Sequence, residues 1–268
     1  MSSTQTFWDH LDALRTVLIR IMAAILLCSV VAFCFKDILF GLVLAPQRSD
    51  FVTYRILEQL AGLFMAGADP LEALSARLIN TGLAQQFLLH VKVSIGAGAM
   101  LASPYILYQL FGFVSPALYA NERKYAVRLV VSGSVMFVLG LLLSYFLVFP
   151  LTYRFLSTYQ ISTIVENTVT IESYIDTLIS ISFAMGIVFE IPVLCWVLGR
   201  MGIISSAMMR HYRRHVCVIL LIIGAIITPT SDVFTLMLVS LPMYLLYELS
   251  IQIVAWSNDR RPVTEAAE

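Results

Sequence analysis

Long apolar stretches separated by short polar segments dominate this chain of 268 residues. The pattern predicts six membrane-spanning helices, at residues 17–35, 87–113, 126–149, 175–199, 214–229 and 233–256. A helix needs about 20 mainly apolar residues to cross a hydrocarbon core about 30 Å thick. We expect the last two helices to be short, because 214–229 falls below that length and Pro242 and Glu248 interrupt 233–256.

The segments outside these stretches differ in length and character. Residues 36–86 form the longest one, and apolar positions at helical spacing within 52–65 and 70–79 predict two short amphipathic helices. These helices either lie on the outer membrane surface or pack as a cap over the bundle. We interpret residues 1–256 as a single membrane domain and residues 257–268 as a disordered polar tail.

Composition supports the membrane assignment. The chain is 59% hydrophobic and only 13% charged, whereas soluble domains are usually about 25% charged. Its mean hydropathy is +0.86 and its formal net charge is zero. The sequence therefore predicts a polytopic, all-α membrane protein and gives no reason to expect nucleic acid as a partner.

Basic residues in the short loops predict the orientation of the chain in the membrane. The loops at 115–128 and 200–215 hold seven lysines and arginines, namely Arg123, Lys124, Arg128, Arg200, Arg210, Arg213 and Arg214. The loops at 150–176 and 228–232 hold one, Arg154. Cytoplasmic loops carry the excess of positive charge, so six spans place both termini in the cytoplasm.

The span 175–199 contains a carboxylate near its middle, Glu190, and a proline two residues later, Pro192. A charge at that depth is disfavoured by a few kcal/mol, so Glu190 should face a bundle interior or a wet cavity. Pro192 lacks a backbone N–H and frees carbonyl groups nearby. Glu190 either holds the bundle together through a hydrogen bond or as a neutral acid, or offers a polar contact to a substrate or partner helix.

Several chemistries are excluded by missing motifs. The sequence contains no Gly-Lys pair and therefore no Walker A loop, and it has neither an H-E-x-x-H nor a G-x-S-x-G motif. We expect no enzyme activity, no cofactor and no metal site. A proton-coupled small-molecule transporter with Glu190 as its proton site is the alternative function, although the halves show no repeat.

Several sequence blocks, in this order and spacing, resemble the TatC family, the polytopic subunit of the twin-arginine protein translocase. The blocks are HLDALR (His10–Arg15), LAP (Leu44–Pro46), SPYILYQLFGFVSPALYANERK (Ser103–Lys124), FAMGIVFEIPV (Phe183–Val193), ITPTSDVF (Ile227–Phe234) and LPMYLLYE (Leu241–Glu248). The resemblance implies a cupped bundle of six helices in the bacterial inner membrane.

The resemblance also implies a function: recognising Arg-Arg signal peptides and, with TatA- and TatB-type single-span subunits, exporting folded proteins by the protonmotive force. It implies an oligomeric translocase and signal-peptide contacts at Glu122, Asp12, Arg123, Phe113, Pro116 and Leu118. Glu190 and Pro192 would form the intramembrane contact to a partner helix. Partner docking or structural roles would fall to Pro46, Asp232, Pro242, Tyr244 and Glu248.

The N-terminal motif departs from the family at one position. The family usually has a glutamate directly before its Leu-Arg, where this chain has Ala13, and Asp12 lies one residue earlier. On a helix that shift rotates the side chain by about 100°. Either Asp12 substitutes from the shifted position, or Glu122 carries more of the arginine recognition.

Overall fold

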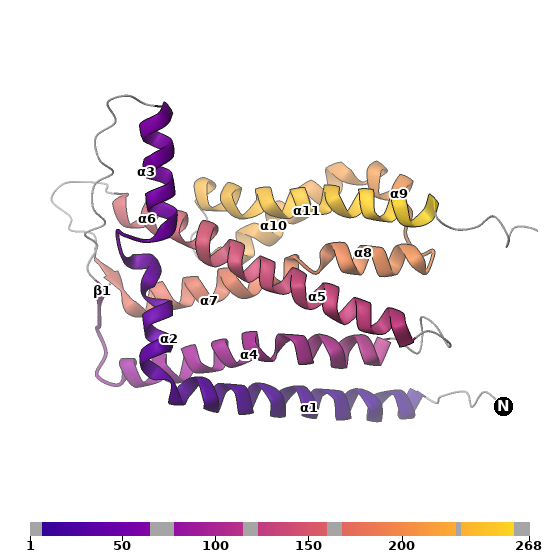
Figure 1. Ribbon diagram of the computed structural model, residues 1–268, viewed down its shortest axis with the longest axis horizontal. Helices are drawn as coiled ribbons and strands as arrows, with labels where there is room; N and C mark the ends of the chain where they lie inside the picture. The colour runs from indigo at the N-terminus through magenta and orange to yellow at the C-terminus, as the bar shows by residue number, and fades with distance from the viewer. Residues whose placement is uncertain (1–6, 65–77, 115–122, 160–167, 229–231, 260–268) are drawn as a thin grey trace, which may run out of the picture. The chain divides into compact units, whose positions relative to one another are not determined.

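Helices make up nearly all of the part of the chain that the computed structural model describes, residues 7–64, 78–114, 123–159, 168–228 and 232–259. Figure 1 shows the order of the elements along the chain. They are α1 (Phe7–Cys34), α2 (Lys36–Val43), η1 (Ala45–Gln47), α3 (Val52–Phe64), β1 (Leu78–Ile79), α4 (Gln85–Val114), α5 (Arg123–Leu143), η3 (Ser144–Val148), α6 (Phe149–Thr158), β2 (Val169–Thr170), α7 (Ile171–Val188), α8 (Ile191–Arg200), α9 (Ser206–His211), α10 (Arg213–Ile227) and α11 (Val233–Asp259).

The all-α membrane fold predicted from the sequence is confirmed. Five segments within the described residues are long and apolar enough to cross a bilayer: Leu11–Cys34, Gln85–Phe113, Val127–Thr158, Ile171–Arg200 and Val233–Ser257. The remaining predicted span corresponds to α10, whose 15 residues reach only about 22 Å. The last helix is not short, because α11 continues for 27 residues through Pro242 and Glu248.

Three other details differ from the sequence predictions. The third span does not end before Pro150, because the π-helical turn η3 leads into α6, where Pro150 occupies a first-turn position that needs no N–H donor. Leu78 and Ile79 form a strand, and 65–77 lies outside the described residues. The tail begins later than expected, because α11 runs to Asp259, and 260–268 also lies outside them.

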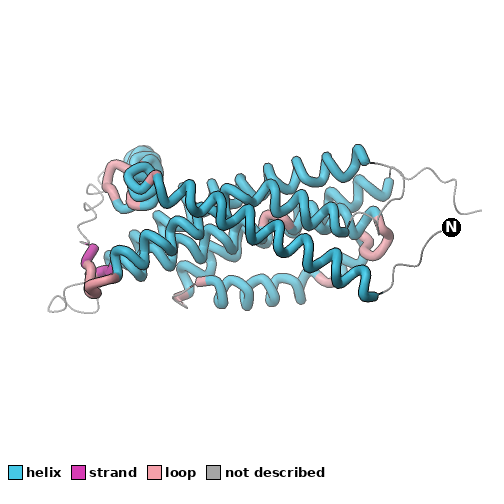
Figure 2. Tube along the Cα trace, turned by 90° about the horizontal axis from the view of Figure 1, so that it is seen from below, coloured by secondary structure: helices cyan, strands magenta, loops and turns pink. Residues whose placement is uncertain are grey.

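The chain divides into two compact units. The first comprises residues 1–134 and 145–179, in which α1 packs along α4 (Figure 1). In the same unit, β1 pairs in parallel with β2, and the two strands are magenta in Figure 2. Its core gathers buried side chains from α2, α4, α6 and α7: Val43, Leu89, Val93, Phe149, Tyr153, Tyr174, Ile175 and Leu178. The second comprises residues 135–144 and 180–268, in which α11 packs against α8, α9 and α10.

Close packing of α1 against α4 depends on a glycine. A Cβ atom added at Gly98 of α4 would lie 2.5 Å from the backbone nitrogen and 2.6 Å from the Cα of Ser29 in α1. Because backbone atoms cannot move aside as a side chain can, only glycine permits this approach. Small residues allow the same close contact between membrane helices generally.

We predict that Gly98→Ala destabilises the protein by about 1–3 kcal/mol, because the added methyl group forces α1 away from α4. The matched control is Gly112→Ala in the same helix, where an added Cβ meets nothing within 4 Å. Alanine favours helices over glycine by up to about 1 kcal/mol, so the control should be neutral or stabilising. Melting temperatures in detergent report both, and equal behaviour of the two variants would contradict the packing argument.

Candidate functional site

A break in the helix places Glu190 between α7 and α8. Glu190 occupies the N-cap position of α8, with φ −75° and ψ −13°, and Pro192 follows in the first turn of that helix. The backbone N–H of Glu190 donates to the carbonyl of Ile187 at 3.0 Å, which is a tighter turn than that of an α-helix. The backbone is therefore interrupted next to the carboxylate, as the position of Pro192 predicts.

The Glu190 side chain is buried, with 7% of its surface exposed. Both of its carboxylate oxygens are buried and have no hydrogen-bond partner among the described residues. A bond that holds Glu190 to a neighbouring helix is thus not found in the part of the chain that the structure describes. Burying such a group without a partner is unfavourable, so Glu190 must be a neutral acid or meet a group outside the described residues.

A pair of small residues on α7 precedes Glu190. Ser182 and Gly186 are four residues apart, which places them on one face of α7, and Glu190 follows in the turn just beyond the end of that helix. Ser182 and Ser144 lie within hydrogen-bonding distance, Oγ to Oγ 3.2 Å. A Cβ added at Gly140 would lie 3.0 Å from the Cα of Gly186, so the C-terminal half of α5 closely approaches this pair.

Pro46 lies in a turn of the predicted outer segment, and carbonyl groups of this turn accept hydrogen bonds from three tyrosines. The bonds are Tyr145 to Leu42 (2.7 Å), Tyr174 to Val43 (2.9 Å) and Tyr54 to Pro46 (3.1 Å). The Tyr54 hydroxyl also lies 3.1 Å from the carbonyl of Pro150. Carbonyls at a helix end lack intrahelical partners, so side chains from α3, η3 and α7 supply donors to the end of α2 and to η1. Burial raises the pKa of the Tyr54 phenol, which keeps it a donor.

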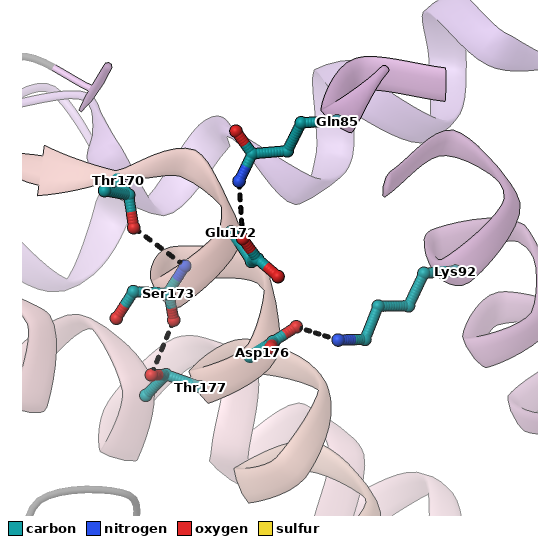
Figure 3. A network of polar contacts seen from close by, with 7 residues as sticks. All are labelled: Gln85, Lys92, Thr170, Glu172, Ser173, Asp176 and Thr177. Carbon is teal, nitrogen blue, oxygen red and sulfur yellow. Dashed lines mark hydrogen bonds and ion pairs between the residues drawn. The ribbon is translucent and has the colours of Figure 1, made fainter. Parts of the chain in front are cut away.

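The N-terminal ends of α4 and α7 are joined by polar side chains (Figure 3). Gln85 donates from Nε2 to Glu172, and Lys92 forms an ion pair with Asp176. The two acceptors are four residues apart on α7, so they lie on the same face of that helix. Such exposed pairs contribute at most about 1 kcal/mol each to the free energy of unfolding. Their main effect is on how the two helices are aligned along their length.

The C-terminal pair of helices carries its own polar contacts. Asp232 accepts a hydrogen bond from the backbone N–H of Thr235 at 2.7 Å and so caps the start of α11. Arg213 at the start of α10 pairs with Glu248 of α11, Nη2 to Oε2 2.7 Å. The Tyr244 hydroxyl donates to the other oxygen of Glu248 at 3.1 Å. These contacts give Asp232, Tyr244 and Glu248 structural roles, and partner docking by Pro242, Tyr244 and Glu248 stays a prediction.

The residues predicted to contact a signal peptide are only partly described. Asp12 is exposed on α1, and its carboxylate makes no hydrogen bond or ion pair with the described residues. Phe113 is half-buried near the end of α4, and α5 begins at Arg123. Glu122, Pro116 and Leu118 lie outside the described residues. The structure therefore does not test whether these six residues form one surface.

Comparisons with known proteins identify the family. Residues 9–242 match the family described as Sec-independent protein translocase protein (TatC). The chain belongs to the TatC family. A relative of that name from Blattabacterium is 32% identical over 258 residues, which cover 95% of this chain and 97% of the relative. The relative from Escherichia coli K12 is 32% identical over 94% of this chain and 88% of its own length.

A solved structure gives the same answer. The chain is similar to a crystal structure of the twin arginine translocase receptor TatC, with a TM-score of 0.74, 31% identity, and coverage of 93% of this chain and 99% of the other. As a TatC protein, the chain is a multi-pass protein of the bacterial inner membrane and a component of a protein translocase. The family favours this function over a small-molecule transporter.

Sequence reasoning did not find the tyrosine contacts around the outer turn or the polar pairs at the helix ends. The tyrosines lie in mainly apolar segments, where an aromatic residue is expected and gives no signal of a hydrogen bond. The carbonyls of Leu42 and Val43 are also remote in sequence from the tyrosines that bind them, and only Pro46 is close to its donor. A usable signal did exist for the ion pair. Lys92 and Asp176 are isolated charges near the same ends of two predicted spans.

We predict that Tyr54→Phe destabilises this TatC protein by about 1–3 kcal/mol, because it removes the donor shared by the carbonyls of Pro46 and Pro150 inside a buried site. Tyr108→Phe is the matched control, since Tyr108 is 57% exposed. Thermal unfolding in detergent should show a lower melting temperature for Tyr54→Phe alone. A Tyr54→Phe protein as stable as the control would show that the hydroxyl does not hold the turn.

Proposed function

We propose that this protein is the receptor subunit of a twin-arginine translocase, which recognises Arg-Arg signal peptides and, with TatA- and TatB-type subunits, exports folded proteins using the protonmotive force. The observation that supports the proposal most strongly is the similarity, over nearly all of both chains, to a structure named as the twin arginine translocase receptor. The family match over residues 9–242 supports it independently.

The arginines of the signal peptide would bind carboxylates at the predicted cytoplasmic face. Glu122 directly precedes α5, and Asp12 lies exposed near the start of α1 without an ion pair among the described residues. A carboxylate accepts a guanidinium through two parallel, charge-assisted hydrogen bonds, which an ammonium cannot form. This chemistry gives a preference for Arg-Arg over Lys-Lys. Arg123, Phe113, Pro116 and Leu118 would shape the rest of the surface.

Glu190 would serve a separate step, the contact with a partner's membrane helix or with an inserted signal peptide. Its buried oxygens have no hydrogen-bond partner among the described residues, and the helix is interrupted at the same place, between α7 and α8. A polar group on an incoming helix would satisfy the carboxylate in a medium that offers no water. Pro242, Tyr244 and Glu248 on α11 would dock partner subunits in the oligomeric translocase.

The receptor function is tested by binding of a labelled signal peptide to the purified protein in detergent. We predict that wild type binds an Arg-Arg peptide more tightly than its Lys-Lys version, and that Glu122→Gln lowers the Arg-Arg affinity by roughly 10–100-fold. That range corresponds to the loss of one hydrogen bond to a charged group, about 1.5–3 kcal/mol. Asp12→Asn, measured in parallel, shows whether Asp12 also contributes to binding the arginines.

Glu58→Gln is the matched control, because Glu58 is an exposed carboxylate on α3, in the predicted outer segment. Its affinity for the peptide should stay within about twofold of wild type. Absence of any Arg-Arg preference in wild type would contradict the proposal. Retention of that preference in Glu122→Gln and Asp12→Asn alike would place the arginine site elsewhere.

A further inference from the structure

The turn between α9 and α10 concentrates positive charge and aromatic rings on an exposed surface. Residues 210–215 are all exposed, and they include three arginines, Arg210, Arg213 and Arg214. The ring of Tyr212 lies between those of His211 and His215, with centroids 5.2 and 5.6 Å away and edge-on geometry. Amphipathic rings of this kind are enriched at the level of the lipid headgroups.

The Arg213–Glu248 ion pair fixes the depth of this turn relative to α11. Glu248 lies 15 residues after Val233, about 22 Å along the helix, and α11 continues for 11 residues, about 16 Å, beyond it. The start of α10 is therefore level with the interior of α11 and well short of its end. Because α10 itself reaches only about 22 Å, a turn at its start falls short of the headgroup plane of a 30 Å hydrocarbon core when the other end of α10 is level with the opposite headgroup plane.

Two of the arginines have no counter-charge in the described parts of the chain. Arg213 is neutralised by Glu248, whereas Arg210 and Arg214 form no ion pair or hydrogen bond with the described residues. An unpaired guanidinium below the headgroup plane is disfavoured and draws an anion toward itself. Phosphate suits it best, because the planar guanidinium donates two parallel hydrogen bonds to phosphate oxygens.

An exposed apolar stripe begins one turn after Arg214. It favours a lipid over a free anion as the ligand, because only a lipid has acyl chains to cover it. Val218, Ile222 and Ile226 follow Arg214 at intervals of four residues, so all four lie along one face of α10. Their exposed fractions are 56%, 55% and 79%. The face thus offers a cation at one end and exposed hydrocarbon along the rest, which matches a phospholipid oriented along the membrane normal.

We propose that the α9–α10 turn is a binding site for an anionic phospholipid. Arg210 and Arg214 hold the headgroup phosphate, Tyr212 and the two histidines border it, and the acyl chains lie along Val218, Ile222 and Ile226. The site is on the side that the basic loops predict to be cytoplasmic, where anionic headgroups attract such clusters. It does not depend on signal-peptide recognition.

The test measures binding of short-chain phosphatidylglycerol to the purified full-length protein in detergent, with phosphatidylcholine of the same chain length and glycerol phosphate as competing probes. Wild type should prefer phosphatidylglycerol. Arg210→Gln/Arg214→Gln should weaken that binding by about 25-fold, since each basic residue near a membrane contributes about a factor of five. Ile222→Asn should weaken lipid binding and leave the weak binding of glycerol phosphate unchanged.

The matched control is Arg48→Gln/Arg55→Gln, which removes the same charge from two exposed residues of the predicted outer segment. Its affinity for phosphatidylglycerol should stay within about twofold of wild type, and all variants should melt at the wild-type temperature. Equal affinity for the two lipids, or full binding by Arg210→Gln/Arg214→Gln, would overturn the site. Glycerol phosphate binding as tight as that of the lipid would overturn the lipid assignment. Complete displacement of the lipid by a single-span subunit would identify the stripe as a helix-docking face instead.

Discussion

Inside a bilayer, a buried polar group finds no water, so the protein itself must supply its hydrogen-bond partner. The described residues meet this constraint in most places by local means, since hydroxyls of Ser29, Ser94 and Ser250 bond to carbonyls one turn earlier in their own helices. Where a helix must end, donors come from elsewhere in the chain. Three tyrosine hydroxyls donate hydrogen bonds to carbonyls of the turn that contains Pro46.

Glu190 stands out against this background. It is the one acidic side chain among the buried polar residues described, and neither oxygen has a partner there. The break between α7 and α8 adds a backbone irregularity at the same place. Hydroxyls such as those of Ser103, Thr152 and Ser240 are also buried without a partner among the described residues, but Glu190 is the only carboxylate in that position, and we propose that it meets a group from another chain. Under the proposed function, that group would come from another translocase subunit or from a signal peptide.

The sequence predicted features that depend on a single segment better than features that depend on contacts between distant segments. Apolar length predicted the positions of the five long spans and the short α10, because spanning is a property of a segment alone, but it predicted a short last helix where α11 is long. The same reasoning failed for Pro242, since a helix packed against α8, α9 and α10 tolerates an internal proline that an isolated one would not. It also missed the strand at Leu78 and Ile79, which exists through pairing with Val169 and Thr170. For Glu122, only the family motif pointed to arginine recognition.

The proposed contact of Glu190 with another chain is tested most directly by cross-linking from a neighbouring residue. A photoreactive residue at Ile187, 63% exposed and one turn before Glu190, should form adducts with a single-span subunit or a signal peptide in membranes that contain the whole translocase. Those adducts should fall severalfold in Glu190→Ala, and the same probe at Leu101 of α4, 64% exposed, should give none. Adducts with lipid alone, or adducts undiminished by Glu190→Ala, would contradict the account.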